Sequence, residues 1–223
     1  MQHELPQRRI VMPPKARYTR DEIIEIALEL VSKKGTEALN ARNLAAALGT
    51  STRPVFTAFK NMNELITEVK AAAMKKFDSY AEIDEKKSPA FKNVGMQMIL
   101  FAAEQPKLFQ MLFMSENKEL MSFNDLFDHL GKTSGLCIEY IQRDYGLDNR
   151  QAMLLFRSMW LYTFSIGGLI ARGVCRYNKE EVSEMLSIEF KAVIGLILSG
   201  KAFDKLEEFQ ENMSPEEFQK HFK

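Results

Sequence analysis

Apolar residues recur at helical spacing along most of the chain. From Arg20 to Lys34 they fall on one helix face, with Thr19 placed to cap that helix and Gly35 placed to end it. The same period continues over residues 61–80, 88–105, 106 onward, 118–145, 149–172, 179–199 and 202–222. Because no alternating β pattern or internal repeat stands out, the sequence predicts an all-α chain.

Residues 40–65 predict two short helices joined by a tight turn. Asn40 is placed to cap the first helix, Gly49 to end it in the left-handed conformation, and Ser51 or Thr52 to cap the second. The residues expected to face inward are Leu44, Ala45 and Leu48 in the first helix and Val55, Phe56 and Phe59 in the second.

This pattern leaves the N-terminal end of the second short helix unburied, with Thr52, Arg53 and the ring of Pro54 exposed. A helix-turn-helix presents the first residues of its second helix to base edges in the major groove in this way. An ordinary helical hairpin has the same periodicity, so periodicity alone leaves both interpretations open.

The segment resembles the DNA-binding region of the TetR repressors in the residues Leu44, Ala45, Gly49, Ser51, Phe56, Phe59 and Leu65. The similarity extends back through the stretch from Tyr18 to Gly35. It implies an N-terminal three-helix helix-turn-helix domain followed by a helical ligand-binding and dimerisation domain. It further implies a transcriptional regulator, most often a repressor, which binds a near-palindromic DNA operator as a homodimer and is released by a small apolar or amphipathic effector.

The chain departs from the family pattern at two positions. Phe56 stands where the family usually has tyrosine, and Met62 where it usually has lysine, and both usual residues contact phosphate. Lys60 can substitute in part. The alternative is therefore a helical protein that binds a small molecule or a partner and has lost DNA binding. The residues assigned to DNA are Lys15, Arg17, Thr19, Asn40, Arg42, Ser51, Thr52, Arg53, Pro54, Phe56 and Lys60.

Charge is unevenly distributed in this formally neutral chain. Residues 1–60 hold ten basic and six acidic side chains, a net charge of +4, which leaves −4 for the remainder. A basic N-terminal segment suits a protein that meets phosphates, although a solubilising tail has the same composition. We expect a flexible basic arm over residues 1–16, a DNA-binding domain over 17–62 and a ligand-binding and dimerisation domain over 63–223.

The expected C-terminal domain is rich in flexible and aromatic apolar side chains. Most of the 13 methionines and 16 phenylalanines of the chain lie there. Such residues line clefts between helices, and they also fill ordinary helical cores. With the family resemblance, we expect a ligand to contact Phe101, Phe109, Phe113, Phe127, Met153, Arg157, Trp160 and Phe164. Arg157 would bind an anionic ligand group, or form an ion pair at the edge of the core.

Two adjacent glycines interrupt the helix over residues 149–172. Each costs about 1 kcal/mol of helix stability relative to alanine, which indicates close backbone packing. That packing is with another helix of the same chain or across a dimer; a local kink in a monomer is the alternative. We expect helices 149–172 and 179–199 to form the dimer interface, with contacts from Gly167, Gly168, Ile188 and Val193.

Other classes of site find little support in the sequence. Cys137 and Cys175 are far apart and predict two buried thiols in a reducing cytoplasm, without a metal site or disulfide. His129 has neighbouring aspartates but no catalytic motif, so we expect neither an enzyme nor a cofactor. The uncharged run Ser158–Ala171 is shorter than the roughly twenty residues that cross a bilayer. We therefore expect a cytoplasmic protein without membrane contact.

Overall fold

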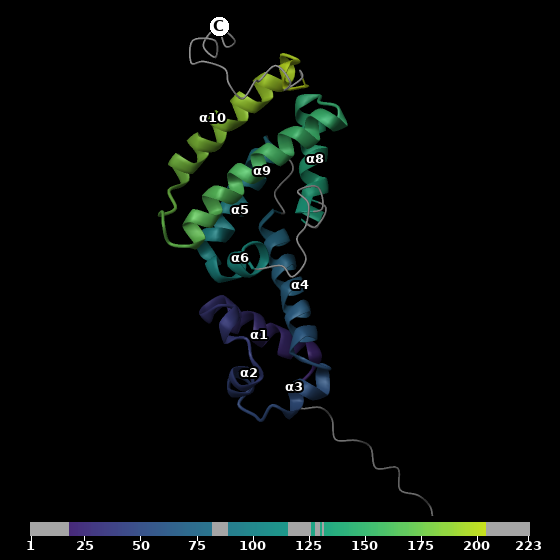
Figure 1. Cartoon of the computed structure of the whole chain (residues 1–223), viewed down its shortest axis with the longest axis vertical. Helices are drawn as coiled ribbons and strands as arrows, with labels where there is room; N and C mark the ends of the chain where they lie inside the picture. The colour runs from purple at the N-terminus through teal and green to yellow at the C-terminus, as the bar shows by residue number, and fades with distance from the viewer. Residues whose placement is uncertain (1–17, 82–88, 116–125, 128–129, 131, 204–223) are drawn as a thin grey trace, which may run out of the picture. The chain divides into compact units, whose positions relative to one another are not determined.

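The computed structural model describes residues 18–81, 89–115, 126–127, 130 and 132–203, and the regular structure within these ranges is helical (Figure 1). The chain divides into two compact units, residues 1–75 and 76–223. We call them the N-terminal and C-terminal units. The all-α fold predicted from the sequence is confirmed, whereas the domain boundaries expected at residues 16 and 62 stay predictions.

The N-terminal unit contains α1 (Arg20–Lys34), η1 (Thr36–Ala38), α2 (Ala41–Ala47), α3 (Arg53–Ala58) and the first part of α4 (Met62–Ala81). Thr19 caps α1 as predicted, since its Oγ1 accepts from the Glu22 N–H at 3.2 Å while its own N–H donates to Glu22 Oε2 at 2.7 Å. At the other end Gly35 has φ 86°, which favours glycine, and α1 stops there.

The core of the N-terminal unit is built from the predicted inward faces. The fully buried side chains of α1 are Ile23, Ala27 and Val31, while Ile24 and Leu28 are only half-buried. These meet the buried residues of the other helices, which are Leu44, Ala45, Leu48, Val55, Phe59, Leu65, Val69 and Ala73. Burial of this apolar surface holds four short helices in one arrangement.

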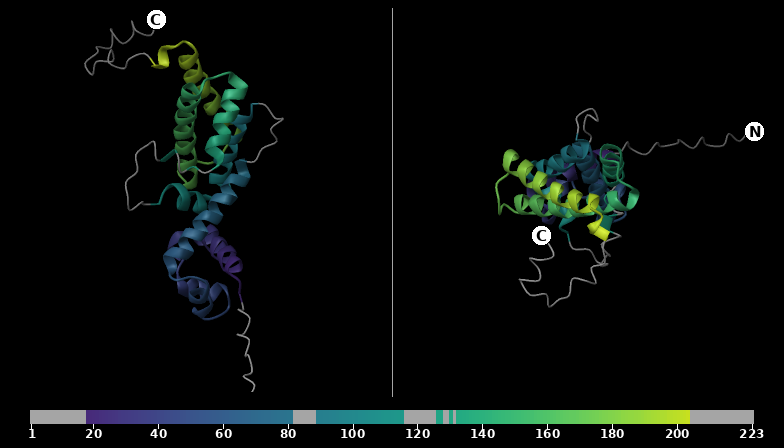
Figure 2. Two further views of the ribbon diagram at one scale, coloured as in Figure 1. Left: turned by 90° about the vertical axis from the view of Figure 1, so that its right-hand side faces the viewer. Right: turned by 90° about the horizontal axis from the view of Figure 1, so that it is seen from above.

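The C-terminal unit contains the end of α4, α5 (Ala90–Glu104), α6 (Pro106–Phe113), α8 (Lys132–Tyr145), α9 (Asn149–Ala171), α10 (Lys179–Leu198) and η2 (Lys201–Phe203). The central helix is α9, which packs against α5, α6, α8 and α10. Figure 2 shows α10 and α9 side by side. In the part of the chain that the structure describes, α9 is the one helix long and apolar enough to cross a membrane. Its contacts with four neighbouring helices account for that composition.

Two predictions about this unit are wrong, and parts of two predicted helices are not tested. A single helix over residues 118–145 is wrong, because Leu130 is not helical and α8 covers Lys132–Tyr145. Residues 118–125 and most of the predicted helix over 202–222 lie outside the described residues. Of the two predicted buried thiols, Cys137 is buried but Cys175 is exposed. Burial raises the pKa of Cys137 to about 12.

Candidate functional site

Local hydrogen bonds fix the turn between α2 and α3. Asn40 caps α2, since its Oδ1 accepts from the Asn43 N–H at 2.9 Å. Gly49 ends that helix with φ 62°, as predicted, and the Thr50 N–H donates to the Ala45 carbonyl at 3.0 Å. Thr52 occupies the N-cap position of α3 without a side-chain cap bond. The backbone geometry at Gly49 therefore defines the turn, and the side chain of Thr52 does not contribute a cap.

The outer face of α3 presents polar, basic and aromatic side chains to solvent. Its exposed residues are Thr52, Arg53, Phe56, Thr57 and Lys60, whereas the ring of Pro54 is half-buried. The prediction that Phe56 faces inward is wrong, because the ring is 50% exposed. Val55 and the C-cap residue Phe59 already supply the inner side of this six-residue helix, and Phe56 lies outside it, about 100° around the axis from Val55.

The segment that contains α2 and α3 has basic residues and no acidic residues. Between residues 38 and 63 there are Arg42, Arg53 and Lys60 and no aspartate or glutamate. All three side chains are exposed. A surface of this kind attracts phosphates and does not repel them locally. Lys15 and Arg17, also predicted to contact DNA, lie outside the described residues.

Arg20 ties α1 to the end of α3 and the start of α4, a role that the sequence did not suggest. Its Nη1 donates to the Ala58 carbonyl at 2.8 Å, and its Nη2 pairs with Glu64 at 2.9 Å and with Glu68 at 2.7 Å. The guanidinium lies 4.2 Å from the centroid of the Phe59 ring. Because Ala58 ends α3, these contacts hold the exposed face of α3 at a fixed angle to α1.

Glu64 and two predicted DNA-binding residues also serve the scaffold. The Lys60 N–H donates to Glu64 Oε2 at 2.7 Å, and this bond, followed by the bond from Arg20, lowers the pKa of Glu64. Thr19 and Asn40 use their side-chain oxygens to cap α1 and α2. Tyr18, next to Thr19, donates from its hydroxyl to the Leu48 carbonyl.

The C-terminal unit contains a partly open cavity of about 230 Å³ between α5, α8, α9 and α10, which we call the main cavity. Its apolar wall consists of Pro89, Phe91, Val94, Gly95, Met98, Cys137, Phe156, Met159, Trp160, Leu186 and Phe190. Its polar lining groups are Lys92, Tyr145, Thr163, Ser187 and Lys191. A mostly apolar pocket with a few convergent polar groups is the usual form of a small-molecule site.

The predicted ligand residues lie mostly beside this cavity. Trp160 lines it, and a much smaller space of about 10 Å³ is lined by Phe109, Phe113, Phe164, Met98, Thr163 and Trp160. Phe101 is fully buried, Met153 is half-buried, and Phe127 packs under the guanidinium of Arg157 at 5.3 Å. The Arg157 Nε is buried without a hydrogen-bond partner among the described residues. Sequence reasoning missed the contribution of α10, whose helical period resembles that of any core helix.

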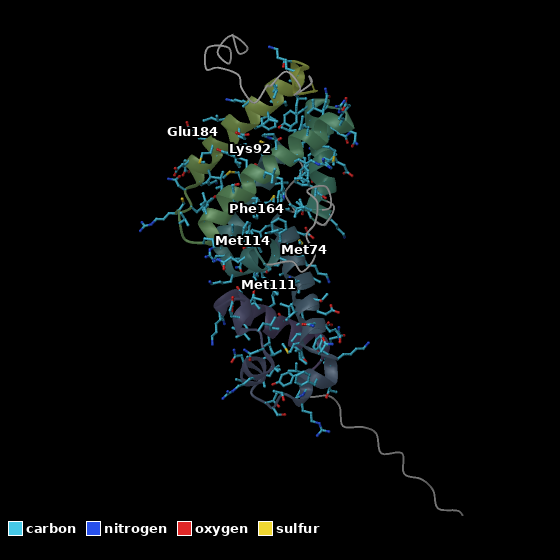
Figure 3. The ribbon with its side chains drawn as sticks, viewed as in Figure 1. Met74, Lys92, Met111, Met114, Phe164 and Glu184 are labelled. Carbon is cyan, nitrogen blue, oxygen red and sulfur yellow. The ribbon has the colours of Figure 1, made fainter. Side chains whose placement is uncertain are left out.

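The predicted aromatic residues instead form a chain of ring contacts from the main cavity to α4. Ring centroids are 5.2 Å apart for Trp160 and Phe164, 6.0 Å for Phe164 and Phe109, and 5.1 Å for Phe109 and Phe113. Phe113 then meets Phe77 of α4 at 5.0 Å. Figure 3 labels Phe164 within this group.

The residues predicted for a dimer interface have different surroundings. A Cβ added to Gly167 would lie 3.1 Å from Phe109 Cζ, so Gly167 packs inside its own chain. A Cβ on Gly168 would meet nothing within 4 Å. Ile188 is exposed and Val193 is half-buried. Further large apolar side chains exposed on α9 and α10 are Leu161, Leu169, Leu196 and Leu198.

Comparison with known proteins agrees with this arrangement. Residues 23–69 match the family described as bacterial regulatory proteins, tetR family. No curated protein matches the chain in sequence. Among solved structures, a TetR-family transcriptional regulator from Vibrio parahaemolyticus is similar with a TM-score of 0.57 and 16% identity, over 78% of this chain and 97% of the other. A TetR-family regulator from Mesorhizobium loti has a TM-score of 0.50 and 16% identity, over 82% and 98%.

In the described ranges, no group of three or more His, Cys, Asp or Glu side chains is placed to hold a metal ion.

The structural similarity establishes the fold, and the sequence match falls on the helix-turn-helix whose outer face carries Arg53 and Lys60. Residues 23–69 are therefore a DNA-binding region of the tetR type, and the chain as a whole has the fold of the two TetR-family transcriptional regulators.

Proposed function

We propose that this regulator is a cytoplasmic repressor that binds a near-palindromic operator as a homodimer and releases it when a small amphipathic effector binds. The observation that carries this proposal is the exposed, acid-free face of α3, which presents Arg53, Phe56, Thr57 and Lys60 on a rigid scaffold. A recognition helix needs such a face, because bases are read by side chains that reach into the major groove.

Each residue of this face has a distinct expected role. Arg53, in the first turn of α3, reads guanine or contacts the adjacent phosphate. Lys60 and Arg42 neutralise phosphates, and Lys15 and Arg17 of the basic arm add further backbone contacts. Phe56 takes the place of the family tyrosine without its hydroxyl, so its exposed ring contributes apolar contact only.

The DNA-reading role is tested by selecting bound sequences from random duplexes with the wild-type protein and with Arg53→Ala. Loss of a base contact should cost about 1–3 kcal/mol and relax the preference at one base pair in each half-site. Thr67→Ala, on an exposed position of α4, is the control and should leave the selected sequence unchanged. An equal loss on all sequences would limit Arg53 to a phosphate contact.

The homodimer rests on the exposed apolar side chains of α9 and α10. Leu161 and Leu169 lie two turns apart on α9, with exposed Ser165 between them. On α10, Ile188 is 62% exposed and is followed on the same side by Ala192 and Gly195, whose small size permits close helix approach. Two copies joined through this face would match the two-fold symmetry of a palindromic operator.

Ligand response rests on the main cavity and the ring contacts beside it. An effector against Trp160 and Met98 would displace Phe164 or Phe101, and both connect to Phe77 of α4 through aromatic contacts. The helix α4 is continuous from Met62 to Ala81, so it includes residues of both units. A ligand shifts DNA affinity only to the extent that it prefers one state of this helix.

The alternative is a binding protein that does not use DNA, which the departures at Phe56 and Met62 favour because each removes a phosphate contact. The two functions differ in the salt dependence of DNA binding, which is steep for a protein that neutralises phosphates and absent for one that does not bind DNA.

A further inference from the structure

Two of the polar residues that line the main cavity are basic. Lys92 of α5 and Lys191 of α10 both line it, and Lys92 Nζ donates to Ser187 Oγ at 2.8 Å. Ser187 in turn donates to the Ser183 carbonyl at 2.7 Å, which fixes the orientation of its hydroxyl. An ammonium group has three donors, and this bond uses one of them. The bond from Lys92 to Ser187 therefore links α5 to α10 in the wall of the cavity.

Negative charge is absent from this lining. Among the described residues that line the main cavity there are two lysines and no aspartate or glutamate. Asp144, beside the lining residue Tyr145, is paired with Arg143 at 2.7 Å, and this contact is the largest cause of its lowered pKa. Glu184, labelled with Lys92 in Figure 3, is an exposed residue of α10 outside the lining. The lining therefore favours an anion over a neutral or cationic group.

A second polar group lies deeper. Thr163 of α9 is 5% exposed and lines the main cavity. Its Oγ1 would be 3.8 Å from a Cβ placed on Gly95, one turn along α5 from Lys92. A hydroxyl can both donate and accept a hydrogen bond. Thr163 therefore adds a polar group to the lining that a polar atom of an occupant could contact.

We propose that the effector is an amphipathic anion, with an apolar body against Phe91, Met98 and Trp160 and an anionic headgroup between Lys92 and Lys191. This inference rests on the ligand response proposed above and specifies its chemistry. A cavity of about 150 Å³ holds benzene, so the volume of about 230 Å³ corresponds to about nine heavy atoms inside the protein. A medium-length alkyl or small aromatic carboxylate has this size and charge.

Binding to the full-length protein tests the proposal, with octanoate, 1-octanol and octylammonium as probes of matched length. Trp160 is the one tryptophan of the chain and lines the cavity, so its fluorescence reports occupancy, with calorimetry as an independent measurement. Octanoate should bind about tenfold more tightly than 1-octanol, equivalent to about 1.4 kcal/mol, and octylammonium should bind more weakly than either. The preference for octanoate should shrink at high salt because the lysines are partly in solvent.

Variants separate charge from shape. Lys92→Met and Lys191→Met together should reduce octanoate affinity to that of 1-octanol and leave 1-octanol unchanged. Lys191→Met alone, at an exposed position, should give part of this loss even if the Lys92 change disturbs folding. Lys179→Met, on the same helix but outside the cavity lining, is the control and should change neither affinity.

Equal binding of octanoate and 1-octanol, no octanoate binding, or lysine variants without effect would overturn the anionic assignment. A separate DNA-binding measurement distinguishes the two proposals. Lysine-dependent octanoate binding that leaves DNA affinity unchanged would uphold the anion site and contradict the ligand response.

Discussion

At the scale of residues, Gly167 and Gly168 are neighbours in α9 with different packing. Gly167 touches the Phe109 ring and Ala102, and Phe109 is itself held by Phe113 and Phe164. Gly168 has open space where a Cβ would be. The glycine pair therefore combines one position required by packing against Phe109 with one, itself buried, that has room for a methyl group.

Alanine substitutions should separate these two roles. Gly167→Ala should lower the free energy of unfolding by about 1–3 kcal/mol, because Phe109 and Ala102 cannot easily move away. Gly168→Ala should raise it by up to about 1 kcal/mol through helix propensity. Urea denaturation followed by circular dichroism checks both. A destabilised Gly168→Ala would show that a partner packs closely there.

Phe56 offers a test at the DNA face. Since the ring is half-exposed, Phe56→Tyr should fold normally and add a hydroxyl where the family places one. A new hydrogen bond to phosphate should strengthen DNA binding by about 0.5–1.5 kcal/mol on specific and non-specific duplexes alike. Fluorescence anisotropy with both duplexes measures this, with Tyr18→Phe as a variant that removes a hydroxyl from the scaffold. Unchanged affinity would place the ring away from the DNA backbone.

At the scale of elements, local signals predicted most helices and long-range contacts were not predictable. Thr19, Asn40 and Gly49 act within a few residues of themselves, so their roles in α1 and α2 could be read from sequence. The bonds from Arg20 to Ala58 and from Lys92 to Ser187 join residues 38 and 95 positions apart, and no periodicity indicates them. Phe56 was misplaced because α3 is too short for its period to define one face.

The contacts of Arg20 with Ala58, Glu64 and Glu68 join α1, α3 and α4, and we call them the clamp. The clamp should make the stability of the N-terminal unit sensitive to acid. Because the pKa of Glu64 in the folded protein lies below its ordinary value of 4.5, Glu64 stabilises the fold above that pH. The contribution disappears as the pH falls through the lower, folded-state pKa. Glu64→Gln should therefore destabilise the protein at neutral pH and converge with wild type in acid. Urea denaturation across this range is the measurement, with Glu37→Gln as control; parallel curves would rule out the clamp.

The exposed faces of α9 and α10 should control assembly. If the proposed dimer forms through these faces, Ile188→Glu or Leu169→Glu should convert it to a monomer with unchanged helix content, because a charge buried in an interface lacks a partner. Met114→Glu, at an exposed apolar position after α6, should leave the dimer intact. Light scattering at micromolar concentration checks the mass. A wild-type monomer would contradict the interface.

At the scale of the whole molecule, a series of aromatic ring contacts leads from the main cavity of the C-terminal unit to α4. Phe113 is the ring that joins Phe109 to Phe77, and it does not line the main cavity. A change at Phe113 should therefore alter the coupling between ligand binding and DNA binding without altering ligand affinity.

Phe113→Leu should preserve octanoate affinity and weaken the effect of octanoate on DNA affinity by about 0.5–2 kcal/mol. Phe127→Leu, which lies on the other side of Trp160, should keep the coupling. DNA titrations with and without octanoate give the coupling factor, and DNA must weaken octanoate binding by that same factor. Identical coupling in wild type and Phe113→Leu would exclude this route.

The most direct test of the account is the salt dependence of binding to DNA from upstream of the gene that encodes the chain. If two subunits neutralise at least four phosphates, log K should fall against log salt with a slope of about −4 or steeper. Affinity for one upstream site should exceed that for random duplex by at least about a thousandfold. A flat salt dependence, or equal affinity for every sequence, would contradict a DNA-binding regulator.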